Sequence, residues 1–161
     1  MNGAKILGIG LSARRALCIH PEVMNLDTRE KVDSACRDKT AGFVRGTKKG
    51  IEDSALCEFY ENLEGKDEID GLEGIYSLED MRSFGRKHKL CPYFVVRRMV
   101  YQANVIVCNY PYVIDTRVGQ VLFNKINDGD CLVVFDEAHN IDNICVDSLT
   151  IMVNKGVINA A

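Results

Sequence analysis

The chain has 161 residues, of which 47% are hydrophobic, and its formal net charge is −3. This composition suffices for the packed core of one domain and excludes an intrinsically disordered chain. The small net charge neither requires nor excludes a nucleic-acid partner, because binding to a polyanion depends on where the charges lie. The sequence opens with no cationic leader, and no apolar run approaches the roughly 20 residues that span a bilayer. We therefore expect a soluble intracellular protein with no membrane partner.

The first predicted element is a strand from Lys5 to Leu11, a short apolar run that we place at an edge of the core. From Ser12 to about Lys89 the sequence is charged and only weakly periodic, so it offers little apolar surface to bury. Such a stretch needs a covalent or metal link to hold it together. Within it, Ser77 predicts the start of a helix, because serine caps helices and the acids Glu79 and Asp80 follow in the first turn.

A second helix is predicted from Pro92, since proline fits the first position of a helix, and this places Cys91 at the N-cap. The apolar runs Ala103 to Cys108 and Cys131 to Phe135 are typical of strands buried in a parallel sheet. A helix from Tyr112 to about Lys125 separates them. The order strand, helix, strand predicts an α/β layer into which the charged stretch is inserted.

Seven cysteines in a chain without secretory features are better explained as metal ligands and buried side chains than as disulfides. The four that come first are Cys18, Cys36, Cys57 and Cys91. Four thiolates suit an iron–sulfur cluster, and a helix N-terminus favours the thiolate of Cys91. Zinc is disfavoured because no Cys-x-x-Cys pair occurs, while scattered buried thiols would explain the spacing equally simply. Cys108, Cys131 and Cys145 fall in or beside apolar segments and are expected in the core.

Asp136 and Glu137 directly follow the last apolar run, at a sheet edge where α/β proteins commonly build ligand sites. There the first carboxylate could hold Mg²⁺, and the second could orient or deprotonate the attacking water in phosphoryl transfer. His139 is a candidate link between a nucleotide site and a nucleic-acid site. No Gly-x-x-x-x-Gly-Lys-Ser/Thr loop occurs in the 161 residues, so the half of an ATP site that grips the phosphates is absent from this sequence.

A basic strip follows a strongly acidic segment of the predicted insertion. It consists of Arg82, Arg86, Lys87, Lys89, Arg97 and Arg98, with Tyr93, Phe94 and Tyr101 nearby. Such a strip could hold a phosphate backbone and offer a stacking surface to a single strand. A solvated helix face is an equally good explanation.

Several short sequence motifs closely resemble those of the XPD family of superfamily 2 DNA helicases, and the likeness spans roughly residues 6–155. They are Leu17-Cys-Ile-His-Pro-Glu-Val23, Gly74-Ile-Tyr-Ser-Leu-Glu-Asp80, Cys91-Pro-Tyr-Phe94 and Val133-Val-Phe-Asp-Glu-Ala-His-Asn-Ile-Asp142. The order and spacing of the cysteines agree with the same family. The likeness is stronger to the eukaryotic branch, the helicase subunit of general transcription and repair factor IIH, than to other iron–sulfur relatives.

The resemblance implies an incomplete RecA-like parallel-sheet motor domain with an inserted, mainly helical iron–sulfur cluster domain. It implies that a [4Fe-4S] cluster is held by Cys18, Cys36, Cys57 and Cys91. It further implies that Asp136, Glu137 and His139 belong to a DEAH box, with Asp136 serving Mg²⁺ and ATP in the complete enzyme. Arg14 matches a basic residue near the cluster, and Tyr93 and Arg97 match positions along the path of single-stranded DNA.

The resemblance also implies a role and a location. Full-length relatives use ATP to translocate 5′ to 3′ on DNA in nucleotide excision repair and transcription initiation. We therefore expect a nuclear protein whose partners are DNA and the other subunits of factor IIH.

The expected organisation is an edge strand of the motor domain at 1–13, the cluster domain at 14–95, part of the motor domain at 96–150 and the start of a further segment at 151–161. The family's phosphate-binding loop, arch domain and second motor domain are missing, so we expect a fragment that does not hydrolyse ATP by itself. Two alternatives stay open. One is a non-catalytic iron–sulfur module that binds nucleic acid, and the other is a structural zinc protein.

Overall fold

A computed structural model of the chain describes residues 6–42, 56–66, 69, 72–127 and 131–150. The chain divides into two compact units, Met1–Cys108 and Asn109–Ala161. Segment 151–161, expected to begin a further part of the protein, lies outside the described residues. Within the described ranges, no helix combines the length and the apolar character that a bilayer crossing requires.

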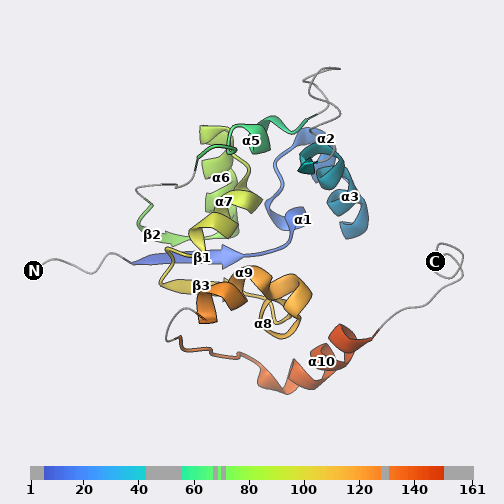
Figure 1. Ribbon diagram of the computed structural model, residues 1–161, viewed down its shortest axis with the longest axis vertical. Helices are drawn as coiled ribbons and strands as arrows, with labels where there is room; N and C mark the ends of the chain where they lie inside the picture. Colours follow the sequence, from blue (N-terminus) through green and yellow to red (C-terminus); the bar gives the residue numbers. More distant parts are fainter. Residues whose placement is uncertain (1–5, 43–55, 67–68, 70–71, 128–130, 151–161) are drawn as a thin grey trace, which may run out of the picture. The chain divides into compact units, whose positions relative to one another are not determined.

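The first unit contains a sheet of three parallel strands in the order β2-β1-β3 (Figure 1). β1 (Leu7–Leu11) pairs on one side with β2 (Gly74–Tyr76) and on the other with β3 (Val105–Cys108). The prediction of an edge strand is therefore wrong for the described sheet, because β1 is its middle strand. β2 was missed because a Gly-Ile-Tyr triplet is too short to show the alternation of a strand.

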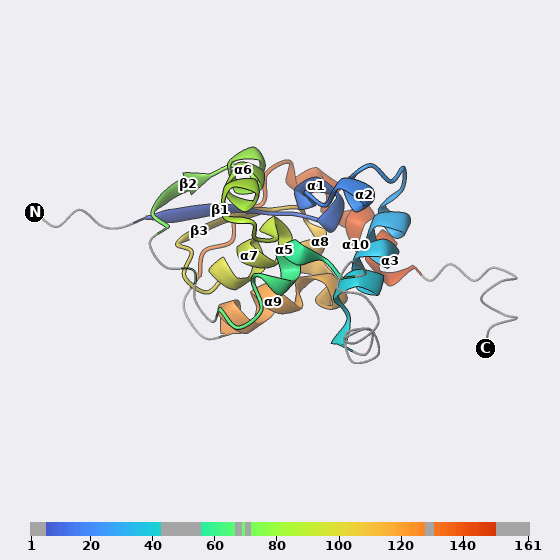
Figure 2. The same ribbon diagram turned by 90° about the horizontal axis from the view of Figure 1, so that it is seen from above.

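Short and medium helices complete the first unit. They are α1 (Arg14–Leu17), α2 (Pro21–Met24), α3 (Arg29–Thr40), α5 (Glu58–Glu61), α6 (Leu78–His88) and α7 (Pro92–Met99). α6 and α7 pack against β1 and against α1 (Figure 2). Fully buried side chains of these helices, including Leu17, Val32, Met81, Val95 and Met99, form the core. The mainly parallel α/β architecture is as predicted.

α6 begins as the sequence predicted. The Ser77 hydroxyl accepts a hydrogen bond from the Asp80 amide at 3.2 Å, and the Asp80 carboxylate accepts one from the Ser77 amide at 2.9 Å. This reciprocal capping box satisfies two amides that a helix start leaves unpaired. α7 begins at Pro92 with Cys91 at its N-cap, also as predicted.

The second unit contains α8 (Pro111–Ile114), α9 (Thr116–Asn127), the 3-10 turn η2 (Ala138–Asn140) and α10 (Ile141–Leu149). The single helix expected between Tyr112 and Lys125 is thus divided in two. Asp115 causes the break, because its carboxylate accepts the Arg117 amide at 2.9 Å and caps α9 in the way N-cap residues do. Arg117 also donates to the carbonyl of Ser148 at 2.9 Å, which ties α9 to the end of α10.

The predicted strand Cys131–Phe135 is wrong for the described residues, where this segment forms no strand. Its side chains are open to solvent, with Leu132 91% and Val134 80% exposed, and Cys131 is likewise exposed rather than in the core. An apolar run becomes a strand only where a neighbouring strand completes its backbone hydrogen bonds. The described part of the chain supplies no such neighbour to this run.

Candidate functional site

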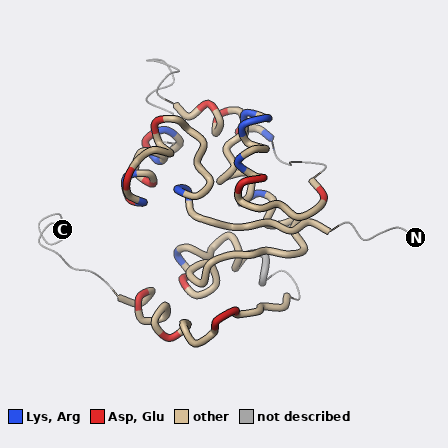
Figure 3. Tube along the Cα trace, turned by 180° about the vertical axis from the view of Figure 1, so that it is seen from behind, with Lys and Arg blue, Asp and Glu red and all other residues tan. Residues whose placement is uncertain are grey.

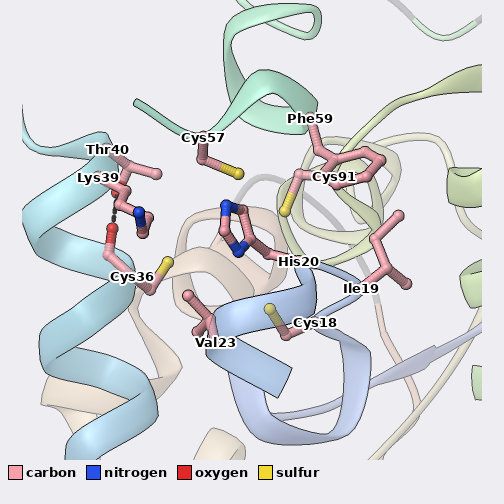
Figure 4. A pocket seen from close by; sticks show the side chains of 10 residues that line it. All are labelled: Cys18, Ile19, His20, Val23, Cys36, Lys39, Thr40, Cys57, Phe59 and Cys91. Carbon is pink, nitrogen blue, oxygen red and sulfur yellow. Dashed lines mark hydrogen bonds between the residues drawn. The ribbon is translucent and has the colours of Figure 1, made fainter. Parts of the chain in front are cut away.

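Four cysteines line one cavity in the first unit (Figure 4). They come from separate segments, since Cys18 follows α1, Cys36 lies on α3, Cys57 precedes α5 and Cys91 precedes α7. Figure 4 shows their sulfur atoms around a common space that also holds the ring of His20. The fold thus brings together the thiols that are far apart in sequence.

Backbone hydrogen bonds join these segments to one another. The amide of Cys57 donates to the carbonyl of Lys39 at 3.2 Å, and the amide of Cys91 donates to the carbonyl of Phe59 at 2.9 Å. The end of α3, the start of α5 and the start of α7 are therefore linked through the main chain. This linkage ties together the segments that carry three of the four cysteines.

The thiols of the cavity favour their protonated form. Burial raises the pKa of Cys18 and Cys57, and it raises the pKa of Cys91 to about 12. Proximity to Cys36 raises all three further, because adjacent thiolates repel each other. The backbone amides at the start of α7 lower the pKa of Cys91, but burial outweighs the helix effect that the sequence suggested. A metal bound here must displace these protons.

The cavity offers four thiols, a donor set of the kind that soft metals and iron–sulfur clusters use. In the described ranges, no group of three or more His, Cys, Asp or Glu side chains is placed to hold one metal ion. A zinc ion needs its sulfur donors roughly 2.3 Å from one point. In a [4Fe-4S] cluster each thiolate binds a different iron atom, so the ligands stand further apart around a larger body. The cavity supplies four thiols, and their ligation of a cluster stays a prediction.

Two arginines flank the ring of Tyr93 beside this cavity. The guanidinium carbon of Arg14 lies 4.6 Å from the ring centroid and that of Arg97 lies 5.1 Å from it, both within cation–π range. Arg14 also contacts the thiol of Cys36 and pairs with Asp33 at 3.5 Å. The structure therefore brings together the three residues that the sequence suggested for DNA contact, and it joins them to a cysteine of the cavity.

An exposed aromatic side chain lies just beyond the end of α7. Tyr93 is only 7% exposed, whereas Tyr101 is 55% exposed. Tyr101, Phe94, Arg97 and Arg98 line an open hollow. Arg98, a residue of the basic strip, donates hydrogen bonds to the carbonyls of Leu63 and Lys66. These bonds tie the segment after α5 to α7.

Sequence reasoning missed three polar residues of the cavity wall, namely His20, Lys39 and Thr40. The signals for them were present. His20 lies two residues after Cys18, and Lys39 and Thr40 follow Cys36 by three and four positions, which is one face of a helix.

Asp136 and Glu137 lie on a turn before α10 in the second unit. Glu137 adopts a left-handed conformation with φ of 51°, and its carboxylate lies 3.3 Å from Nδ1 of His139. The Tyr110 hydroxyl donates to the carbonyl of Asp136, and the Tyr110 ring stacks on Phe135 at 5.9 Å between centroids. In the trace coloured by charge, acidic positions mark this turn and α10 (Figure 3). The three predicted residues are thus close together and exposed, and their roles toward Mg²⁺ and ATP stay predictions.

Comparison with known proteins agrees with the resemblance in the sequence. The chain is 42% identical over 159 residues to the general transcription and DNA repair factor IIH helicase subunit XPD of Arabidopsis thaliana, covering 98% of this chain and 21% of that protein. It is 41% identical over 156 residues to the protein of the same name from Schizosaccharomyces pombe, covering 96% of this chain and 20% of that protein. It is 36% identical over 139 residues to regulator of telomere elongation helicase 1 of Rattus norvegicus, covering 86% of this chain and 10% of that protein.

The chain therefore spans about a fifth of the length of the XPD relatives that it matches. The family model DEAD_2 matches residues 1–158, which is nearly the whole chain. The resemblance to the XPD helicases is thereby confirmed, and the chain belongs to the DEAD_2 family.

Proposed function

We propose that this chain is the part of an ATP-dependent XPD-type DNA helicase that carries its [4Fe-4S] domain and its DEAH box. The observation that carries the proposal is the shared cavity of Cys18, Cys36, Cys57 and Cys91. It occurs in a chain that is 42% identical to an XPD helicase subunit over 98% of its length. The names of these relatives support a role in transcription and DNA repair, and hence a nuclear location and the other subunits of factor IIH as partners.

The proposed role of the cluster is structural. When bound, it would supply bonds from iron to four thiolates and so join four separate segments of the chain. Those bonds would fix α3 and α7 relative to each other and hold Arg14 and Arg97 against Tyr93. Single-stranded DNA is the proposed ligand of this basic surface, since its phosphates suit guanidinium groups and its bases can stack on exposed rings such as Tyr101.

The acidic turn has the proposed catalytic role. In the complete RecA-like motor, Asp136 would hold Mg²⁺ bound to ATP, and Glu137 would orient the attacking water. His139, 3.3 Å from the Glu137 carboxylate, is placed to hold that side chain in position. The resemblance to XPD supports translocation 5′ to 3′ as the motion that hydrolysis drives.

Purification of the chain under anaerobic conditions tests the cluster. We expect broad visible absorption together with iron and acid-labile sulfide. Serine in place of Cys18, Cys36, Cys57 or Cys91 should abolish the colour, because a missing thiolate leaves an iron atom without its ligand. Cys131→Ser is the matched control, since Cys131 is exposed and does not line the cavity. A colourless protein that carries zinc would contradict the proposal and favour a structural zinc site.

A second candidate is a non-catalytic iron–sulfur module that binds nucleic acid. It is favoured by the basic surface that Arg14 and Arg97 form around Tyr93 beside the cavity, because such a surface needs no nucleotide to bind a phosphate backbone. The flanking coding sequence separates the two candidates. A phosphate loop upstream in the same reading frame supports the helicase, and its absence supports the binding module.

A further inference from the structure

Arg98 holds the chain that follows α5 against the last turn of α7. One of its terminal nitrogens donates to the carbonyl of Leu63 at 2.9 Å and also to the carbonyl of Lys66. Leu63 is fully buried, so the anchor point belongs to the core. Hydrogen bonds from a charged donor are stronger than those between neutral groups. The two bonds therefore fix the end of α5 relative to α7.

α5 and α7 are also joined closer to the cavity. The amide of Cys91 donates to the carbonyl of Phe59 at 2.9 Å, and the ring centroids of Tyr60 and Phe94 lie 4.6 Å apart. Phe94 is one wall of the open hollow at the end of α7. The hold of Arg98 on the end of α5 thus reaches the hollow through the contact of Tyr60 with Phe94.

The two neighbouring arginines of the hollow are engaged differently. The guanidinium carbon of Arg97 lies 5.1 Å from the centroid of the Tyr93 ring. A cation–π contact does not use up the N–H donors of a guanidinium, so a phosphate can still accept hydrogen bonds from Arg97. Arg98 instead directs a donor nitrogen to backbone carbonyls of its own chain.

We propose that Arg98 is a positioning residue for the single-stranded DNA site and not a phosphate contact. It holds the segment 63–66 on α7, and through Tyr60 and Phe94 it keeps the hollow in the shape that accepts a base beside Arg97. The inference rests on the proposed function, because it takes single-stranded DNA as the ligand of the hollow.

Trypsin digestion of the full chain tests the hold on the backbone. The Lys66 carbonyl that Arg98 binds belongs to the peptide bond that trypsin cleaves. We expect cleavage after Lys66, followed by mass spectrometry, to be about two- to ten-fold faster in Arg98→Met, because loss of the hydrogen bonds lets the segment open. Arg98→Lys should restore the wild-type rate of cleavage, since an ammonium can donate to both carbonyls.

Fluorescence anisotropy of labelled single-stranded DNA at several salt concentrations tests the role in binding. Arg98→Met should weaken binding about two- to ten-fold, because a wall of the hollow that stacks on a base is displaced. The factor should be similar at every salt concentration, because no phosphate contact is lost. Arg97→Ala is expected instead to reduce the slope of log affinity against log salt by about one.

Arg29→Met is the matched control and should match the wild type in both measurements. Arg29 is 60% exposed on α3 and does not line the hollow. The inference is overturned if Arg98→Met leaves cleavage after Lys66 or affinity for DNA unchanged, or if it lowers the salt slope by about one. A wild-type chain that does not bind single-stranded DNA would contradict the proposed function, whereas cleavage after Lys66 would still report whether Arg98 holds the segment.

Discussion

The ring of Tyr93 keeps two positive charges in one place. Arg14 and Arg97 lie 4.6 and 5.1 Å from its centroid, and the ring itself is 7% exposed. Arg14 is directed to the cavity through Cys36 and to Asp33. Arg97, by contrast, lines the open hollow that it shares with Phe94, Arg98 and Tyr101. Of these three residues, Arg97 is therefore the one that a phosphate of bound DNA would meet first.

We expect Arg97→Ala to weaken binding of single-stranded DNA and to reduce the slope of log affinity against log salt by about one, because one phosphate contact is lost. Fluorescence anisotropy at several salt concentrations measures both quantities. Arg29→Ala is the control, since Arg29 is 60% exposed on α3 and pairs with Asp33 at 3.8 Å. Equal losses in the two variants would show that only overall charge matters.

At the scale of elements, the contact between α6 and α7 decides where Cys91 lies. Gly85 of α6 faces Pro92 so closely that a Cβ there would stand 2.4 Å from the proline ring and 2.7 Å from the carbonyl of Leu90. Only glycine permits this approach. The connection between the two helices is therefore short and fixed, and it ends at the N-cap cysteine.

Gly85→Ala should destabilise the chain by about 1–3 kcal/mol through overpacking, although alanine normally favours a helix over glycine. Urea unfolding followed by circular dichroism measures the change. Gly42→Ala serves as the control, because nothing lies within 4 Å of a Cβ at Gly42. An increase in stability for Gly85→Ala would contradict the packing argument.

The helices and strands differ in how far the sequence could predict them. α6 and α7 were predicted because Ser77, Asp80 and Pro92 act within one helical turn of their own positions. The middle position of β1 and the run Cys131–Phe135 were misjudged, since pairing of strands depends on distant segments. The break at Asp115 was missed because it depends on a single hydrogen bond, in which the Asp115 carboxylate accepts the amide of Arg117.

In the candidate site, too, local features could be predicted from the sequence and features that depend on distant segments could not. The identity of the four cavity cysteines followed from their resemblance to a family, because their spacing alone carries no pattern of metal binding. The thiolate character expected for Cys91 depended on the helix start, which is local, whereas burial is a property of the whole unit and dominates. Lys39 was missed because its pairing with Glu22 joins two helices.

At the scale of the whole molecule, the chain carries the residues proposed to serve Mg²⁺ and ATP. Asp136 and Glu137 lie exposed on a turn, and no phosphate-binding loop occurs in the 161 residues. We expect the chain alone to show no ATP hydrolysis above background in an assay of released phosphate, because nothing in it grips the phosphates. Glu137→Gln is the control and should give the same background. A rate that is abolished by Glu137→Gln would contradict this prediction.

The cavity draws its sulfur atoms from residues as far apart as Cys18 and Cys91. A ribosome must therefore have made the chain through the start of α7 before all of its ligands exist. Until then a nascent chain presents at most three of the four cavity thiols. If the proposed cluster is bound, delivery of iron and sulfide would accordingly follow synthesis of this region.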